Sequence, residues 1–302
     1  MDLDISQASL PVYKALASEV RLKIIDLLST RNMSVQDLSS ELGISSSIVL
    51  MHLNKLADAN IIKFRYRGHR KLSILNIDNI HISFPKKVYP DFSSYTVRVP
   101  VGQYTGYAVK PSCGLAGEHN FIGKVDQPTY FMDPKRVNAQ MIWWNNGYVE
   151  YQFPKYFENI NHVEMLDISA ELGSEFPFSN NAWPSDISVF INDKEIGFWT
   201  SPGDFSDTRG KFTPDWVPDN VNQYGILKTF RVTNHGSYLD GQPLSDISLK
   251  DIKNESDTIT IRFQIKNSAK HKGGCTIFGA GFGNYPQDIE MKVFYSKKDQ
   301  TA

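Results

Sequence analysis

The sequence has few cysteines and no long apolar run. Its 302 residues include only Cys113 and Cys275, whereas secreted β-rich proteins of this size often carry several disulfides. No apolar run is long enough to cross a bilayer, and the N-terminal stretch MDLDISQASLPVYK has acids where a signal peptide needs basic and then apolar residues. These absences favour a cytoplasmic protein. A single bridge between the two cysteines stays open as an alternative.

The chain also lacks the usual spacings of metal and catalytic sites. His119, His162, His235 and His271 are scattered, without the spacing of metal ligands. The GAGFG run (residues 279–283) superficially resembles a phosphate-binding loop, but no helix pattern follows it, so a bulged strand or a loop beside a ligand fits better. Acids are abundant, but abundance gives no paired geometry. We expect no catalytic residue, no metal and no cofactor.

What the sequence does contain is a basic patch near its N-terminus. Residues 1–90 hold 12 Lys or Arg and 8 Asp or Glu, whereas residues 91–302 hold 20 and 25. Within residues 45–75 one acid, Asp58, accompanies six basic residues, which are Lys55, Lys63, Arg65, Arg67, Arg70 and Lys71. Such a segment is suited to a polyanion. A solvated surface without a partner is the alternative.

Periodic apolar residues predict helices in the first 60 residues. Apolar residues recur at helical spacing from Val12 to Leu28, with Ser18 as a cap inside a short break. MSVQDLSSELG predicts a second short helix, which Ser34 and Asp37 cap as a box-like pair. The glycine at its end, Gly43, is free to take a positive φ and stop it.

A third helix and a basic hairpin follow. In ISSSIVLMHLNKLADAN a serine cap opens the helix, and Val49, Leu53 and Leu56 form its inner face, so the residues between them lie outward. Residues 61–77 alternate in polarity on both sides of a tight turn at residues 67–69. This order predicts a winged helix–turn–helix. Its third helix can enter a major groove while its hairpin lies along phosphates.

The N-terminal region resembles a known family. YKALASEVRLKIIDLL, SVQDLSSELGISSSIVLMHLNKLADANII and the RGHRK wing are similar to the ArsR-type transcriptional regulators, over roughly residues 10–80. The resemblance implies a bacterial or archaeal DNA-binding protein, usually a homodimer. The chain departs from the metal sensors of the family, because SVQDLSS has no Cys or His. It also has Leu50-Met51 where the family often has polar residues, and no final dimer-completing helix is visible after the hairpin.

We predict that the third helix and the hairpin contact double-stranded DNA. Docking of another protein by the winged helix is the alternative, and His52 could equally be a packed helix residue. The predicted DNA-binding residues are Ser45, Ser46, Ser47, Met51, His52, Asn54, Lys55, Arg65, Arg67, His69, Arg70 and Lys71.

Beyond a proline-containing stretch the helical period fades. At least seven segments alternate or are rich in β-branched and aromatic residues, and Asn192-Asp193 predicts a hairpin between two of them. The fold class is therefore α+β in two domains. These are a winged helix–turn–helix (1–84), a linker (85–93) and an all-β sandwich (94–302). VFINDKEIGFW and the strand order resemble jelly-roll modules of the galactose-binding type.

The second domain combines aromatic and polar residues in segments that read as loops. Aromatic faces beside Asn and Asp suit a sugar, whereas tryptophans that fill a sandwich core are the alternative. The predicted ligand-binding residues are Trp143, Trp144, Asn145, Asn146, Trp183, Trp199, Asp215 and Trp216.

The predicted function joins the two domains. It is a DNA-binding regulator of ArsR-like type whose sandwich senses a small molecule, with a carbohydrate as the candidate, and so modulates operator binding. One alternative is a carbohydrate-binding protein whose winged helix docks another protein. Another is a sandwich that only clamps a homodimer.

Overall fold

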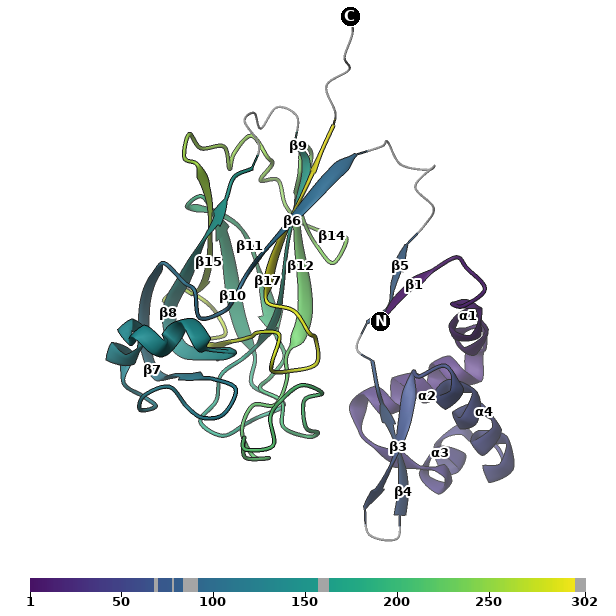
Figure 1. Ribbon diagram of the computed structural model, residues 1–302. Helices are drawn as coiled ribbons and strands as arrows, with labels where there is room; N and C mark the ends of the chain where they lie inside the picture. Colours follow the sequence, from purple (N-terminus) through teal and green to yellow (C-terminus); the bar gives the residue numbers. More distant parts are fainter. Residues whose placement is uncertain (68–69, 78, 84–91, 157–162, 297–302) are drawn as a thin grey trace, which may run out of the picture. The chain divides into compact units, whose positions relative to one another are not determined.

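The protein forms two compact units. The computed structural model describes residues 1–67, 70–77, 79–83, 92–156 and 163–296. The units are residues 1–91 and 92–302 (Figure 1). Among these described residues the first unit has four α-helices, and the second unit is built on β-strands.

The first unit also contains a small sheet. Strand β2 joins the β3–β4 hairpin in an antiparallel sheet of order β2-β4-β3, which confirms the predicted winged helix–turn–helix. The elements are α1 (Leu10–Leu16), α2 (Glu19–Thr30), β2 (Met33–Ser34), α3 (Val35–Leu42), α4 (Ser46–Asp58), β3 (Ile62–Arg67) and β4 (Arg70–Leu75).

Local sequence explains where α3 begins and ends. The Ser34 hydroxyl accepts from the Asp37 N–H, and the Asp37 carboxylate accepts from the Ser34 N–H at 2.9 Å, a complete capping box. Gly43 ends the helix in the left-handed region, at φ 66°. Ser18 precedes α2 as predicted, but its side chain makes no capping hydrogen bond.

A buried arginine ties three helices together. Arg21, on α2, is only 7% exposed. It donates to the Ala15 carbonyl and, at 2.7 Å, to the Lys14 carbonyl. These carbonyls lie in the last turn of α1, where helical partners are missing. The same guanidinium reaches the ring of His52 on α4.

The residues after the hairpin form a short strand. Strand β5 (His81–Ser83) pairs in parallel with β1 (Asp2–Asp4). The first residues of the chain are thereby attached to the segment that leads to the second unit.

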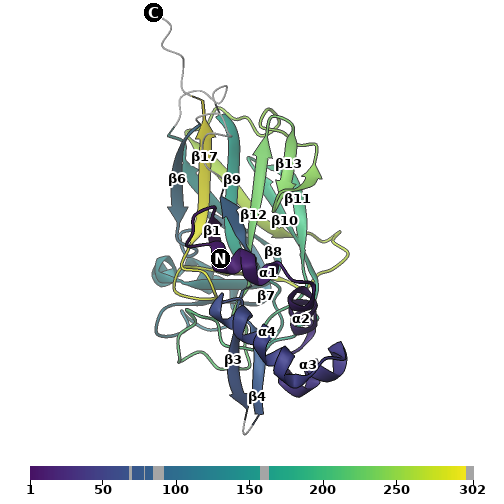
Figure 2. The ribbon, with the colours of Figure 1, turned by 90° about the vertical axis from the view of Figure 1, so that its right-hand side faces the viewer.

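The second unit is an antiparallel sandwich. One sheet runs β11-β10-β15-β8-β7 and the other β6-β17-β9-β12-β13-β14, and β16 pairs with both β8 and β9. Figure 2 shows the strands β6, β17, β9, β12 and β13 side by side. The elements are β6 (Ser93–Val99), β7 (Gly106–Ala116), β8 (Met141–Pro154), β9 (Val163–Gly173), β10 (Ser185–Ile191), β11 (Lys194–Ser201), β12 (Ile226–Thr233), β13 (Gly236–Leu239), β14 (Gln242–Ser245), β15 (Thr258–Ile265), β16 (Cys275–Phe278) and β17 (Ile289–Tyr295), with short 3-10 helices η2 (Pro128–Met132) and η3 (Pro134–Asn138).

Alternation along the strands places the core between the two sheets. Every second residue of β15, from Ile259 to Ile265, is buried, and residues of β9 and β17 face them in the same apolar cluster. The predicted hairpin at Asn192-Asp193 is confirmed. Both residues have positive φ, 48° and 63°, as a type I′ turn requires.

Strand β7 was not predicted from the sequence. Its sequence GYAVKPSCGLA contains Pro111 and Gly114, which usually mark turns. In the structure the proline lies between Lys110 and Cys113, where the pairing of β7 with β8 shifts register. Gly114 is required because an added Cβ would lie 2.2 Å from the Trp143 ring.

The two cysteines are free and buried. Both lie opposite Trp144, one on β7 and one on β16, so strand β8 separates them. Two inter-strand spacings amount to roughly 10 Å, beyond the reach of a disulfide. The alternative of a single bridge is therefore wrong. In the part of the chain that the structure describes, no helix is both long and apolar enough to span a membrane.

One buried carboxylate fastens the loop that contains GAGFG. Glu171, on β9, is 0% exposed. Its oxygens accept from the backbone N–H groups of Gly225, Asn284 and Tyr285 at 2.9–3.1 Å. Gly283 lies so close that a Cβ there would be 2.2 Å from Glu171 Oε1. The last glycine of the run, Gly283, permits this close approach, and strand β17, not a helix, follows the run.

We expect Glu171→Gln to destabilise the β unit by roughly 3 kcal/mol, because an amide NH₂ would face backbone donors in place of one carboxylate oxygen. Urea unfolding followed by tryptophan fluorescence measures this, since all five tryptophans lie in that unit. The exposed Glu255 gives the matched control, Glu255→Gln. Equal unfolding midpoints for the two variants would contradict the assignment.

Candidate functional site

The outward face of α4 brings most of the predicted base-contacting residues together. Val49, Leu53 and Leu56 are 0% exposed, which fixes the rotation of the helix. Ser45 caps the helix by accepting from the Ile48 N–H. The predicted contacts that are exposed on this helix or at its cap are Ser45, Ser46, Ser47, Met51, Asn54 and Lys55.

His52 lies apart from that face. It is partly buried, and its Nδ1 is 3.4 Å from the Arg21 guanidinium. Burial, and then the charges of Arg21 and Lys55, lower the pKa of its imidazole. The ring is therefore neutral at pH 7 and supplies no positive charge for a phosphate. Its role in DNA contact stays a prediction.

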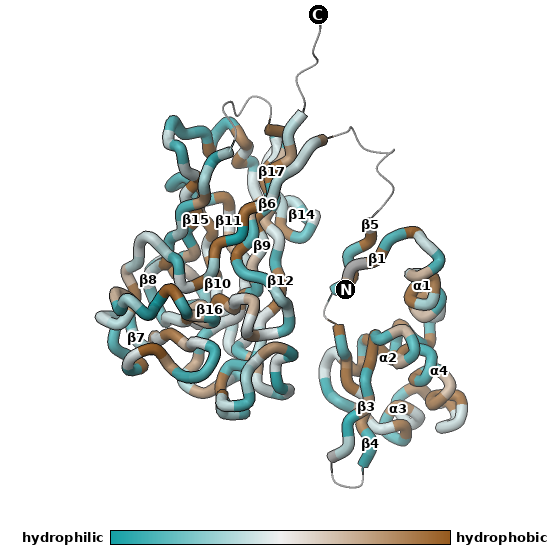
Figure 3. Tube along the Cα trace, viewed as in Figure 1, coloured by the Kyte–Doolittle hydropathy of each residue, from teal (hydrophilic) through white to brown (hydrophobic). Residues whose placement is uncertain are grey.

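The hairpin carries the remaining basic residues. Arg65, Arg70 and Lys71 are exposed, and the Lys71 ammonium lies 3.8 Å from the centroid of the Phe64 ring. Figure 3 shows the hairpin changing from hydrophobic near the helices to hydrophilic towards its tip. Arg67 pairs with Arg70 at the end of β3, although its side chain is not described, and His69 lies outside the described residues.

This arrangement suits a duplex. An α-helix with its side chains is about as wide as the major groove of B-DNA. Exposed Ser and Asn side chains can reach base edges, while the cations of a neighbouring hairpin can reach phosphates, which supply affinity without sequence choice.

In the β unit, the predicted ligand-binding residues occupy three places. Trp144 and Trp199 belong to the main core, and Trp144 donates its indole N–H to the Gly147 carbonyl. Trp143 and Trp216 come together around Phe121, at ring-centroid distances of 5.9 and 5.0 Å. Trp183 stands elsewhere, against Phe176.

The expectation that these tryptophans occupy loops is wrong for three of them. Trp143 and Trp144 lie within β8 and Trp199 within β11, and each is at most 9% exposed. Asn145 and Asn146 continue β8, and Asp215 is exposed beside Trp216. Trp183, at 37% exposure, is the tryptophan most open to solvent.

A buried aspartate anchors the connection between β9 and β10, which carries Trp183. Asp204 exchanges two backbone hydrogen bonds with Asn180, at 2.9 and 3.0 Å. Its carboxylate accepts from the Phe176 N–H at 2.9 Å. Phe178, on the same connection, is 68% exposed. We call residues 176–183 the aromatic loop.

The anchor is a pair of buried carboxyl groups. Burial raises the pKa of Asp204 to about 8, and burial raises the pKa of Glu175 well above its usual value, with the nearby Asp204 adding to that shift. Asp204 is 0% exposed, and its Oδ1 has no hydrogen-bond partner. Asp204 is therefore mainly protonated at neutral pH.

The predicted ligand-binding residues include neither of these two acids nor the two phenylalanines. EFPFSNNAWP (residues 175–184) already shows aromatics among polar residues, so Phe176 and Phe178 could have been found there. Nothing local marks Asp204, because its burial depends on strands distant in the sequence.

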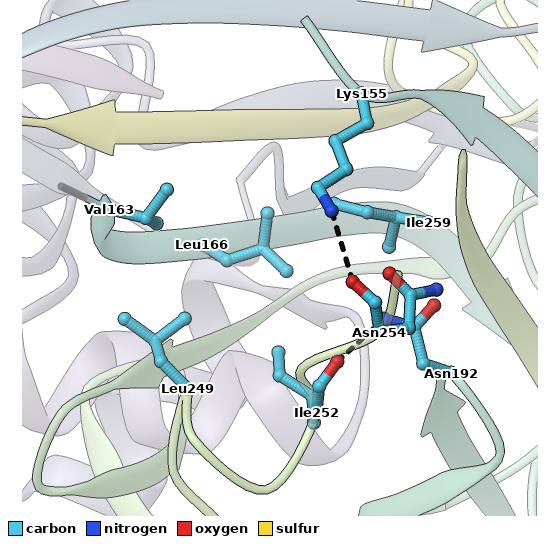
Figure 4. Close-up of a pocket in the computed structure, with 8 residues that line it drawn as sticks. All are labelled: Lys155, Val163, Leu166, Asn192, Leu249, Ile252, Asn254 and Ile259. Carbon is cyan, nitrogen blue, oxygen red and sulfur yellow. Dashed lines mark hydrogen bonds between the residues drawn. The ribbon is translucent and has the colours of Figure 1, made fainter. Parts of the chain in front are cut away.

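A small crevice lies elsewhere in the sandwich. Figure 4 shows Lys155 pointing towards the Asn254 carbonyl, to which its ammonium donates at 3.1 Å. Leu166, Ile252 and Ile259 contribute to its mainly apolar wall. The crevice is too small for a sugar, and its polar groups are engaged in joining the connection between β14 and β15 to β8 and to the turn after β10. No set of three His, Cys, Asp or Glu residues among those described is placed to hold a metal ion.

We expect the protonation of Asp204 to set a pH dependence of stability. Its pKa is about 8 in the folded protein and near 3.8 in the unfolded chain. Stability therefore falls as pH rises from about 4 to 8, by up to roughly 1.4 kcal/mol per pH unit. Asp204→Asn, which keeps the acceptor for the Phe176 N–H, should flatten this slope in urea unfolding at pH 5 and pH 8. Asp215→Asn, at an exposed position, is the control. A wild-type slope in Asp204→Asn would refute the assignment.

Comparison with known proteins identifies the first unit. Residues 18–63 match the family model described as "Bacterial regulatory protein, arsR family". HlyU from Vibrio cholerae is 30% identical, over 23% of this chain and 75% of its own, with a TM-score of 0.22. The homodimeric winged helix–turn–helix DNA-binding domain of Mb0332 from Mycobacterium bovis is 27% identical over 22% and 62%, with a TM-score of 0.22.

The β unit has a weaker match. The CBM36-1 domain of a multidomain xylanase, from the hindgut metagenome of Trinervitermes trinervoides, is 9% identical over 68% of this chain and 99% of its own, with a TM-score of 0.29. That similarity assigns no ligand. No curated protein matches the chain. Residues 18–63 therefore form a helix–turn–helix of the ArsR family of bacterial regulatory proteins.

Proposed function

We propose that the protein is a homodimeric transcriptional regulator whose winged helices bind operator DNA and whose β unit binds an effector that alters operator affinity. The observation that carries the proposal is the exposed outer face of α4, next to a hairpin whose described cations include the exposed Arg65, Arg70 and Lys71. Such a protein works in the cytoplasm, where the DNA is.

A homodimer is supported by exposed apolar residues outside the DNA-facing elements. Ile5, Leu10 and Ile82 are 55%, 41% and 41% exposed. Ile82 lies on β5, and Ile5 follows β1, its partner strand. Exposed apolar residues of this kind favour a protein contact, and two-fold symmetry would match two half-sites of an operator.

The aromatic loop is the candidate effector site. Phe178 and Trp183 are exposed, and the amides Asn180 and Asn181 stand between them. Exposed aromatic faces next to amides suit a carbohydrate. An effector changes operator affinity only if it binds one arrangement of the dimer more tightly than the other.

The alternative function is carbohydrate binding with a winged helix that docks a protein. The same aromatic loop favours it. The two proposals differ in DNA affinity, because a docking module has no phosphate contacts for salt to weaken.

We expect Arg70→Ala to weaken binding to every DNA sequence and to lower the slope of log K against log salt by about one. Fluorescence anisotropy with labelled duplexes at about 50 and 200 mM salt measures both effects. Lys250→Ala, which removes an exposed cation from the β unit, should leave them unchanged. Absence of salt-sensitive DNA binding by the wild type would refute the regulator proposal in favour of docking.

We expect Trp183→Ala to abolish the fluorescence response to the effector while leaving DNA affinity without effector unchanged. The measurement is a titration with a panel of mono- and oligosaccharides. Phe198→Ala is the control, because Phe198 is 48% exposed on strand β11, outside the aromatic loop. An unchanged response in Trp183→Ala would move the site away from this loop.

A further inference from the structure

The centre of the outward face of α4 is apolar. Met51 is 46% exposed. On a helix its neighbours on the same face are Ser47, one turn before, and Asn54 and Lys55, one turn after. Leu50 and Ile48, on either side of this row, are 39% and 46% exposed. A recognition helix that read base edges only through hydrogen bonds would carry polar side chains at these positions.

The residues around Met51 indicate which kind of partner binds over it. Between residues 45 and 75 the chain has six basic residues and a single acid. The basic residues that the structure describes on the hairpin after the helix include Arg65, Arg70 and Lys71, and all three are exposed. An apolar helix face together with exposed cations on the hairpin complements a polyanion that presents apolar groups. The major groove of DNA fits this description, because the thymine C5 methyl is its apolar group.

We propose that Met51 reads thymine by packing its thioether against the C5 methyl group. This inference rests on the proposed DNA-binding function and specifies its substrate class, half-sites with A·T pairs at their centre. A thioether has no hydrogen-bond donor and is a weak acceptor, so it cannot read the amino and carbonyl edges of the other bases. Asn54, on the next turn, has the amide that pairs with adenine N6 and N7.

Leu50 and Ile48 extend the apolar surface on both sides of Met51. Removing either should reduce the preference for thymine less than removing Met51, because they lie away from the middle of the face. Ser47 carries a hydroxyl that can contact either a base edge or a phosphate, so it adds affinity without deciding the central base pair.

Uracil provides a direct test, since deoxyuridine lacks only the C5 methyl and keeps the hydrogen-bonding edge of thymidine. The full-length protein first selects duplexes from a random-sequence pool at low salt. The best-bound duplex is then made with deoxyuridine in place of thymidine. We expect the wild-type Kd to rise about fourfold for each contacted methyl group. Met51→Leu should keep this ratio, and Met51→Ser should reduce it towards one.

Met132→Ser is the matched control, because Met132 is 65% exposed on η2 in the β unit. It should retain the wild-type ratio. Equal binding of the thymidine and deoxyuridine duplexes by the wild type, with salt dependence intact, would overturn the thymine inference and leave the regulator proposal standing. A Met51→Ser variant that keeps the wild-type ratio of the two Kd values would also overturn the inference. If that variant in addition changed its oligomeric state, the face would bind protein and not thymine. Absence of salt-sensitive binding would overturn both proposals.

Discussion

The packing of one helix face determines what the first unit can do. Val49, Leu53 and Leu56 of α4 are completely buried. Rotating the helix would expose these side chains, at roughly 1.5–3 kcal/mol each. The outward row of Ser47, Met51 and Asn54 is therefore held in one orientation. A surface that is to read bases needs this rigidity, because base-edge contacts tolerate little displacement.

The charged residues of the first unit differ in burial between the helices and the hairpin. Arg21 is buried and is occupied by the last carbonyls of α1, so it serves the fold and not the ligand. The exposed Arg70 and Lys71 belong to the hairpin, where a charge costs little to keep hydrated. In the proposed function, phosphate affinity and base choice thus come from different elements, and substitutions can separate them.

In the β unit, buried carboxyl groups hold the connections between strands in place. Glu171 holds the glycine-rich connection through three backbone N–H groups. Asp204 holds the aromatic loop and has one oxygen without a partner. Glu171 accepts from three backbone donors, whereas Asp204 has fewer donors and its burial raises the pKa of its carboxyl group to about 8. The loop that presents Trp183 thereby depends on the ionisation of one residue.

By itself, the sequence determined the features that depend on neighbouring residues. The capping box of Ser34 and Asp37, the buried face of α4 and the turn at Asn192-Asp193 all follow from spacing or local conformational preference. Only the tertiary structure decided which tryptophans are buried, why the two cysteines stay apart, and that Asp204 anchors the aromatic loop. These features depend on contacts between distant parts of the chain; β15 and β16, for example, both pair with β8 across a hundred or more residues. Composition and periodicity carry no information about such pairings, because they describe only the local chain.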